Sequence, residues 1–117
     1  MLNRNETLDR MFQALADPAR RQMVERLSRG PASVSELAAP LPMSLPAVVQ
    51  HLKVLEDSGL VRSEKVGRVR TCTLDAGQMS LAEKWISERR RGWETRLDRL
   101  DAFLSANPDP SEPPEKT

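Results

Sequence analysis

The chain has 117 residues, a formal net charge of +1 and one cysteine, Cys72. The length indicates a single domain, and a net charge so close to zero does not by itself indicate a nucleic-acid partner. The lone cysteine excludes an intramolecular disulfide and any metal site built from several cysteines of one chain. Apolar runs stay well short of the roughly 20 residues that span a bilayer, and the N-terminal stretch lacks the apolar core of a signal peptide. We therefore expect a cytoplasmic protein with no membrane partner.

The first 29 residues predict two helices. Residues 3–15 carry an apolar stripe at the i, i+3, i+4, i+7 spacing of an amphipathic helix, formed by Leu8, Met11, Phe12 and Leu15. Asp17 and Pro18 suit the N-cap and the first position of a second helix, because the carboxylate accepts from free backbone N–H groups and proline needs no donor there. This helix should continue to about residue 29, where a glycine-proline pair ends it.

A helix-turn-helix is expected next. Ser33 and Glu36 fit a capping box that opens a short helix over residues 33–39, and two prolines then stop it. Ser44 caps the following helix, which Gly59 can close in a left-handed conformation. One face of that helix is apolar at helical spacing and should be buried, through Val48, Leu52 and Leu55.

The other side of the Ser44 helix presents an uncharged-to-basic surface. Pro46, Val49, Gln50 and Lys53 lie there, while the acidic residues are confined to the last turn. A helix that enters a DNA groove needs few carboxylates near the phosphates and side chains that reach base edges. This helix is therefore the candidate recognition helix.

A basic β-hairpin is predicted after the recognition helix. Residues 61–66 and 69–74 are rich in Val, Thr and Arg and are joined at Gly67 and Arg68, as in a tight hairpin. The position is that of a wing. A turn at residues 75–77 should lead into a final helix over residues 78–105. The expected fold class is mostly α with a small β-hairpin, a winged helix-turn-helix with a long C-terminal dimerisation helix.

The final helix carries an apolar face too long for a small body to cover. It can serve as core, as dimer seam or as the wall of a ligand pocket, and we favour the seam because an uncovered stripe is a liability in a monomer. The expected dimer interface consists of Leu8, Met11, Phe12, Trp85, Trp93, Leu97, Leu100 and Leu104. Arg89 stands in register with this face and can pair across the interface or meet an anionic ligand. We expect residues 1–106 to form the domain, and the acidic, proline-rich residues 107–117 to be disordered.

The segments LADPARRQMVERL (15–27), SVSELA (33–38), MSLPAVVQHLKVLEDSGLV (43–61) and GRVRTCTL (67–74) occur in this order. With them the chain closely resembles the ArsR-type winged helix-turn-helix repressors of bacteria. The resemblance implies a homodimer that binds an inverted-repeat operator in double-stranded DNA, represses transcription and releases the operator when an inducer arrives. The inducer is not given by the sequence.

The chain departs from that family in two places. Leu45 and Val49 stand where the family often carries Arg or Gln and Ser, so we expect fewer polar base contacts and a thymine methyl as the partner of Val49. The stretch SELAAPLPMS holds no Cys or His, and the final helix holds no His. A transition-metal site needs three or four convergent ligands, so we predict no metal sensing and no cofactor.

The DNA-binding residues we predict are Ser44, Leu45, Pro46, Val49, Gln50, His51, Lys53, Lys65, Arg68 and Arg70. Gln50 suits a bidentate contact to adenine, and Lys53 suits a phosphate. Ser44 can both cap its helix and lie near a phosphate. For His51 a DNA contact and a structural role are equally compatible with its position on the flank of the helix. The basic hairpin residues suit the minor groove or a phosphate, against the alternative of a solvated charged hairpin.

Two other function classes are kept as alternatives. One is a repressor that responds to a small molecule or to thiol chemistry, for which Cys72 would have to be more than a half-buried apolar residue. The other is a winged-helix protein-interaction module that does not bind DNA. An enzyme is not expected, because no phosphate loop, nucleophile elbow or acid/base pair stands at motif spacing.

Overall fold

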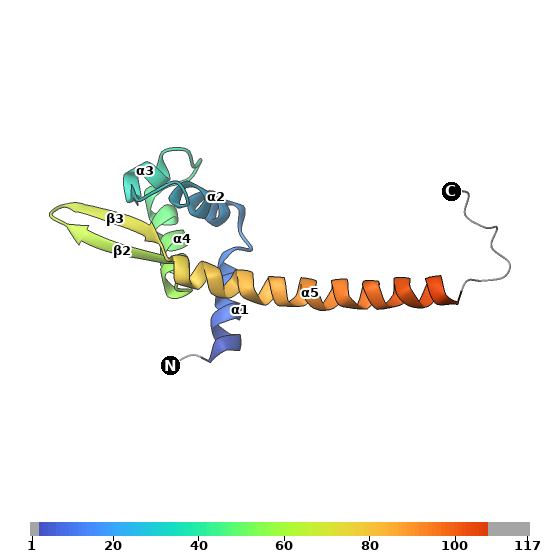
Figure 1. Cartoon of the computed structure of the whole chain (residues 1–117). Coiled ribbons are helices and arrows are strands. Elements are labelled where there is room, and N and C mark those ends of the chain that lie inside the picture. Colours follow the sequence, from blue (N-terminus) through green and yellow to red (C-terminus); the bar gives the residue numbers. More distant parts are fainter. Residues whose placement is uncertain (1–2, 108–117) are drawn as a thin grey trace. The chain divides into compact units, whose positions relative to one another are not determined.

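A computed structural model of the chain describes residues 3–107, and Figure 1 labels its helices and strands. In chain order these are α1 (Arg4–Ala14), α2 (Pro18–Leu27), β1 (Ala32–Ser33), α3 (Val34–Ala38), α4 (Leu45–Asp57), β2 (Val61–Val66), β3 (Val69–Leu74) and α5 (Ala76–Ala106). The predicted fold class, mostly α with a small hairpin in a winged helix-turn-helix arrangement, is confirmed. Most of the predicted tail, residues 108–117, lies outside the described residues.

Side-chain caps fix where the N-terminal helices begin. Asn3 caps α1 and forms a capping box with Glu6, a signal that the apolar pattern alone did not reveal. Asp17 Oδ1 accepts from the backbone N–H groups of Ala19 and Arg20 at 2.8 and 3.2 Å, so the predicted cap of α2 is confirmed. α2 ends at Leu27 rather than near residue 29.

The sheet has three antiparallel strands in the order β1-β3-β2. The hairpin of β2 and β3 is confirmed, with Val66 opposite Val69 and with Gly67 at a left-handed φ of 63° in the turn. Strand β1 was not predicted, because two residues are too few to show an alternating pattern. Its Ala32 pairs with Cys72, and both side chains are buried.

Two compact units make up the described residues, one ending at Ala82 and the other beginning at Glu83. The core lies in the first unit, where the predicted inner face of α4 is confirmed by the complete burial of Val48, Leu52 and Leu55. Leu8 and Met11 belong to this core, with only 4% and 0% of their surface exposed. Their assignment to a dimer seam is corrected, because side chains already covered within one chain have almost no area to offer a partner.

Helix α5 begins two residues earlier than predicted. The backbone N–H of Gln78 donates to Asp75 Oδ1 at 3.1 Å, so Asp75 satisfies a free donor of the first turn and Ala76 and Gly77 are helical rather than part of a turn. Between residues 83 and 106 most side chains of α5 are exposed within one chain. Among residues 3–107 no helix has the length and apolar content that crossing a membrane requires.

Candidate nucleic-acid interface

The exposed face of α4 begins at its cap. Ser44 Oγ accepts from the backbone N–H of Ala47 at 3.3 Å, which confirms Ser44 as the N-cap. Of the α4 side chains predicted to bind DNA, His51 is partly buried, and the exposed ones are Leu45, Pro46, Val49, Gln50 and Lys53. Because the opposite face of α4 is fully buried, the helix holds these side chains in a fixed spatial order.

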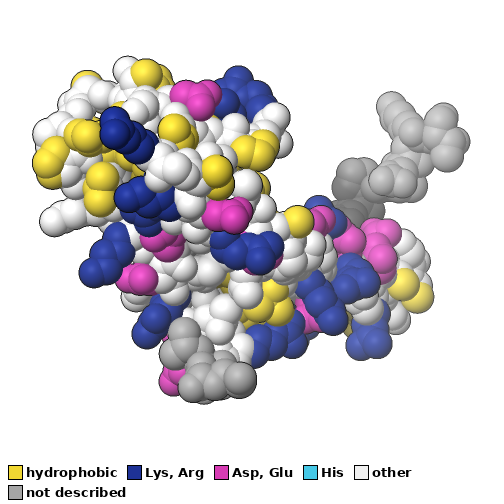
Figure 2. Space-filling model, turned by 90° about the vertical axis from the view of Figure 1, so that its left-hand side faces the viewer, with side chains coloured by type: hydrophobic (Ala, Val, Ile, Leu, Met, Phe, Trp, Pro, Cys, Tyr) yellow, Lys and Arg dark blue, Asp and Glu magenta, His cyan; other side chains and the backbone are white. Residues whose placement is uncertain are grey.

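The charge along α4 suits an anionic partner. The first turn of the helix contains no acidic residue, and its earliest carboxylate, Glu56, is paired with Arg70. A helix N-terminus also carries the positive end of the helix dipole. On the face shown in Figure 2, Lys and Arg are interspersed with Asp and Glu. The uncharged-to-basic character of the N-terminal half of α4 therefore follows from the residues of that helix itself.

His51 is held by an arginine from α2. Arg20 donates through Nε to the Ala14 carbonyl at 2.7 Å and through Nη2 to the Gln13 carbonyl at 3.1 Å. Its Nη1 lies 3.2 Å from His51 Nδ1. A guanidinium can only donate, so Nδ1 is the acceptor and the imidazole proton is on Nε2. His51 therefore has a structural partner and keeps one donor that Arg20 does not use.

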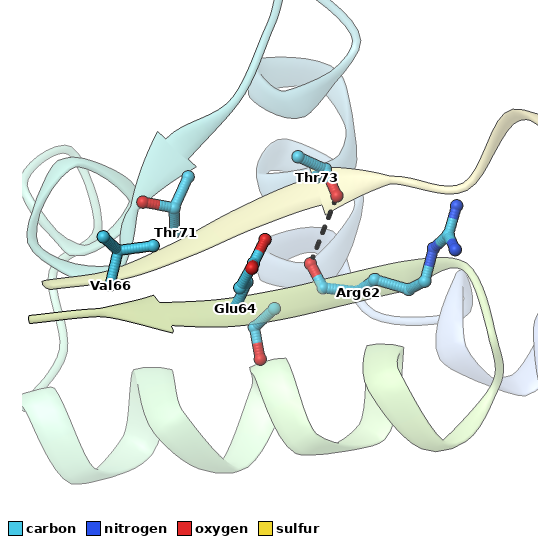
Figure 3. Close-up of a pocket in the computed structure, with 6 residues that line it drawn as sticks. Arg62, Glu64, Val66, Thr71 and Thr73 are labelled. Atoms are coloured by element: carbon cyan, nitrogen blue, oxygen red, sulfur yellow. Dashed lines mark hydrogen bonds between the residues drawn. The ribbon is translucent and has the colours of Figure 1, made fainter.

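Only two of the three basic hairpin residues predicted to bind DNA lie at the exposed tip of the hairpin. Lys65 and Arg68 are exposed, with the apolar Val66 and Val69 beside them. Arg70 instead points back to Glu56 and Ser63, to which it is bonded. A pocket on the hairpin is lined by Arg62, Ser63, Glu64, Val66, Thr71 and Thr73 (Figure 3).

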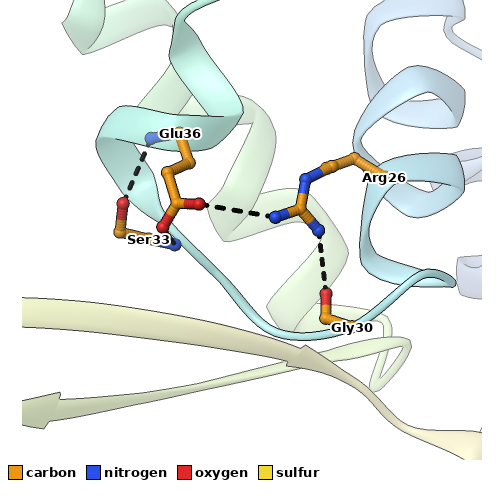
Figure 4. Close-up of polar contacts among 4 residues, drawn as sticks. All are labelled: Arg26, Gly30, Ser33 and Glu36. Atoms are coloured by element: carbon orange, nitrogen blue, oxygen red, sulfur yellow. Dashed lines mark hydrogen bonds and ion pairs between the residues drawn. The ribbon is translucent and has the colours of Figure 1, made fainter.

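The short helix α3 is fixed in front of α4 by a polar cluster (Figure 4). The predicted capping box is confirmed: Glu36 N–H donates to Ser33 Oγ and Ser33 N–H donates to Glu36 Oε1, each at 3.1 Å. Arg26 from α2 donates to the Gly30 carbonyl at 3.1 Å and pairs with Glu36 at 3.4 Å. The hydrogen bond from the Ser33 backbone N–H, ahead of the nearby Arg26 charge, lowers the pKa of Glu36. The cluster thereby joins the start of α3 to α2 and to the loop between them.

The thiol of Cys72 is completely buried rather than half-buried. Burial raises the pKa of Cys72, the Glu56 carboxylate raises it further, and Arg70 acts in the opposite direction. A buried neutral thiol is a poor nucleophile, which disfavours the redox-responsive alternative. In the stretch from residue 3 to residue 107, no three His, Cys, Asp or Glu residues are grouped so that they could hold a metal ion.

On α5, the guanidinium of Arg89 lies over the ring of Trp85, 5.0 Å from its centroid. The stacked pair accounts for the place of Arg89 in the apolar register, since the ring face attracts the cation. Further along, the helix exposes large apolar side chains, namely Trp93, Leu97, Leu100, Phe103 and Leu104. Phe103 was not among the predicted interface residues.

Residues 15–64 match a family model described as a helix-turn-helix domain. An HTH-type transcriptional regulator of Mycobacterium tuberculosis, Rv2034, is 55% identical over 67 residues, which are 57% of this chain and 63% of that protein. An uncharacterized HTH-type transcriptional regulator of Bacillus subtilis, YuzN, is 33% identical over 90 residues, which are 70% of this chain and 98% of that protein. The chain spans between 48% and 63% of the length of four of its curated relatives.

Solved structures agree with the observed fold. The crystal structure of an ArsR family transcriptional regulator has a TM-score of 0.73 at 50% identity, covering 80% of this chain and 97% of that one. An ArsR-like transcriptional regulator from Rhodococcus sp. RHA1 has a TM-score of 0.72 at 30% identity, covering 85% and 93% respectively.

Proposed function

Because this chain belongs to the ArsR family of winged helix-turn-helix transcriptional regulators, we propose that it binds double-stranded operator DNA as a homodimer and represses transcription without sensing a metal. The family consists of transcriptional regulators, not enzymes. The observation that carries the proposal is the exposed N-terminal half of α4, which combines groove-sized side chains with an absence of acidic residues in its first turn. A helix of this kind fits the major groove.

The contacts are divided between bases and phosphates. Gln50 reads a base edge, and Val49 and Leu45 supply apolar contacts of the kind a thymine methyl offers. Lys53, Lys65 and Arg68 are exposed cations that neutralise phosphates or enter the minor groove. His51, whose Nδ1 contacts Arg20, offers its Nε2–H as a further donor to the DNA. Ser44 and Pro46 bring the helix N-terminus close to the backbone of the DNA.

The proposed dimer seam is the apolar face of α5. Trp93, Leu97, Leu100 and Leu104 expose about half of their surface or more within one chain, and Trp85 continues the face beneath Arg89. Phe12 of α1 is half-exposed and stays in the proposed seam. An isologous pair of chains would set two recognition helices about 34 Å apart, one turn of DNA, and hence select an inverted repeat.

Footprinting on the region upstream of the protein's own gene would first locate the binding site. Binding to DNA fragments that contain this site would then be measured by fluorescence anisotropy. Wild-type protein should bind in low salt, and log K should fall linearly with log salt. Lys53→Ala should weaken binding to all sequences and reduce the salt slope by about 0.9, whereas Gln50→Ala should change the preferred base at one position of each half-site. Lys84→Ala, which removes an exposed lysine of α5, is the charge-matched control. If neither α4 variant differs from this control, the proposed contact surface is wrong.

A further inference from the structure

Three side chains from α4 and from both strands of the hairpin form a closed ring of hydrogen bonds. Glu56 stands in the last turn of α4, Ser63 in β2 and Arg70 in β3. Ser63 Oγ donates to Glu56 Oε1 at 2.6 Å, and Arg70 Nε donates to Ser63 Oγ at 2.9 Å. Arg70 Nη2 closes the ring by an ion pair with the same Glu56 oxygen. The serine hydroxyl is thus used both as donor and as acceptor.

The ring is the last anchored point of the hairpin before its tip. Every residue from 64 to 69 is exposed, so nothing within the first unit covers the chain beyond Ser63 and Arg70. The two charged side chains are only 38% and 23% exposed, and such partly covered, charge-assisted bonds hold geometry better than a fully exposed ion pair. The planar fork of Arg70 uses two nitrogens on two partners, which fixes direction as well as distance.

We propose that Glu56, Ser63 and Arg70 form a positioning site that sets the orientation of the wing relative to the recognition helix, and that Arg70 serves DNA recognition through this ring rather than by touching DNA. The inference rests on the proposed function, since DNA is the ligand that reads this orientation. α4 and the hairpin tip must meet two neighbouring parts of one duplex at the same time. A hairpin already held at the right angle loses less conformational freedom on binding.

Cys72 gives a readout that needs no DNA. It is the only cysteine of the chain, it pairs with Ser63 across the hairpin, and its side chain is completely buried. A thiol reagent such as 5,5′-dithiobis(2-nitrobenzoic acid) reaches it only when β3 moves away from the elements that cover it or when the domain unfolds. A change in the labelling rate between the wild type and a folded ring variant therefore measures how much the ring contributes to holding the hairpin closed.

Arg70→Gln should raise the labelling rate of Cys72 about five- to tenfold, as expected for the loss of one partly buried ion pair and its hydrogen bonds. Electrostatics alone predicts the opposite, because Arg70 lowers the pKa of Cys72 and its removal leaves less thiolate. Arg68→Gln, the same change at the exposed tip, should leave the rate unchanged. The charge-swapped double variant Glu56→Arg/Arg70→Glu should return the rate toward that of the wild type, because the pair is restored with its ends exchanged.

Arg70→Lys guards against a variant that does not fold. Lysine keeps the charge but cannot bond both partners in the same geometry, so its labelling rate should lie between those of the wild type and Arg70→Gln. Circular dichroism identifies any unfolded variant beforehand. Wild-type labelling rates in every folded Arg70 variant would overturn the proposal.

Salt dependence of DNA binding separates positioning from contact. Loss of a phosphate contact reduces the slope of log K against log salt by about 0.9; we expect this for Arg68→Gln and an unchanged slope for Arg70→Gln. An equal reduction in both variants would show that Arg70 touches DNA and would overturn the proposal. If the wild-type protein binds no duplex at low salt, the proposed function fails, while the labelling rates still decide whether the ring holds the hairpin.

Discussion

Replacing Leu97 by alanine should weaken the proposed dimer about 30-fold without unfolding the single chain. Leu97 exposes 45% of its surface in one chain, on the apolar face of α5. Full burial of a leucine side chain stabilises by about 1.5–3 kcal/mol, so covering the exposed half contributes about 1 kcal/mol per chain. Both chains lose this contribution, and about 2 kcal/mol per dimer corresponds to about a 30-fold larger Kd.

Sedimentation equilibrium over a series of protein concentrations measures this change. Leu45→Ala is the matched control, since Leu45 is also a leucine and is 55% exposed, but on α4. It should leave the dimer Kd unchanged and weaken DNA binding at concentrations where the protein is dimeric. Leu97→Ala should weaken DNA binding only at concentrations below its new dimer Kd. An unchanged dimer Kd for Leu97→Ala would refute the assignment of this face to the seam.

Three further predictions concern the fold. Leu52→Ala empties a fully buried position of α4 and should lower the free energy of unfolding by about 3 kcal/mol in urea titrations; a loss below about 1 kcal/mol would contradict its place in the core. The backbone N–H of Arg20 holds the pKa of Asp17 below its ordinary value of 3.8, so the stabilisation by this carboxylate is present at neutral pH and is lost as the pH falls through that value toward the lowered pKa. Asp17→Asn should therefore lose less stability in acid than the wild type, and equal pH profiles would exclude this contribution. Gly59→Ala should destabilise the fold by about 1 kcal/mol or more, because Gly59 has a φ of +83° that alanine rarely adopts. Gly92→Ala should stabilise it by up to about 1 kcal/mol, because an added Cβ meets nothing within 4 Å in α5 and alanine favours a helix. Thermal denaturation measures the direction of both changes, and a shift of the melting temperature in the same direction for both variants would refute the reasoning.

The sequence predicted which residues of α4 are exposed more fully than it predicted what each candidate residue does. The exposed residues of α4 follow from the helical period, because Val48, Leu52 and Leu55 turn one face inward and leave the other to solvent. Arg70 could not be assigned in this way. Alternation along β3 tells which side of the sheet it occupies, but its partner Glu56 is fourteen residues away on another element.

The same limit applies to His51 and to the dimer seam. The contact of His51 with Arg20 spans 31 residues of sequence, and no local pattern marks it. Leu8 and Met11 show the pattern of an amphipathic helix whether the covering partner is the same chain or a second one, and only the packing of α1 in the first unit shows that they are already covered.

The sequence by itself determined those element boundaries and turns that a capping side chain or a glycine marks. Ser33 with Glu36, Ser44, Gly59 and Gly67 act on backbone groups within a few residues, so their effects can be read locally. Tertiary structure alone decided which polar side chains are committed inside the chain and which are left for a partner. That decision depends on contacts between residues distant in sequence, which form only when the helices and the sheet have packed together.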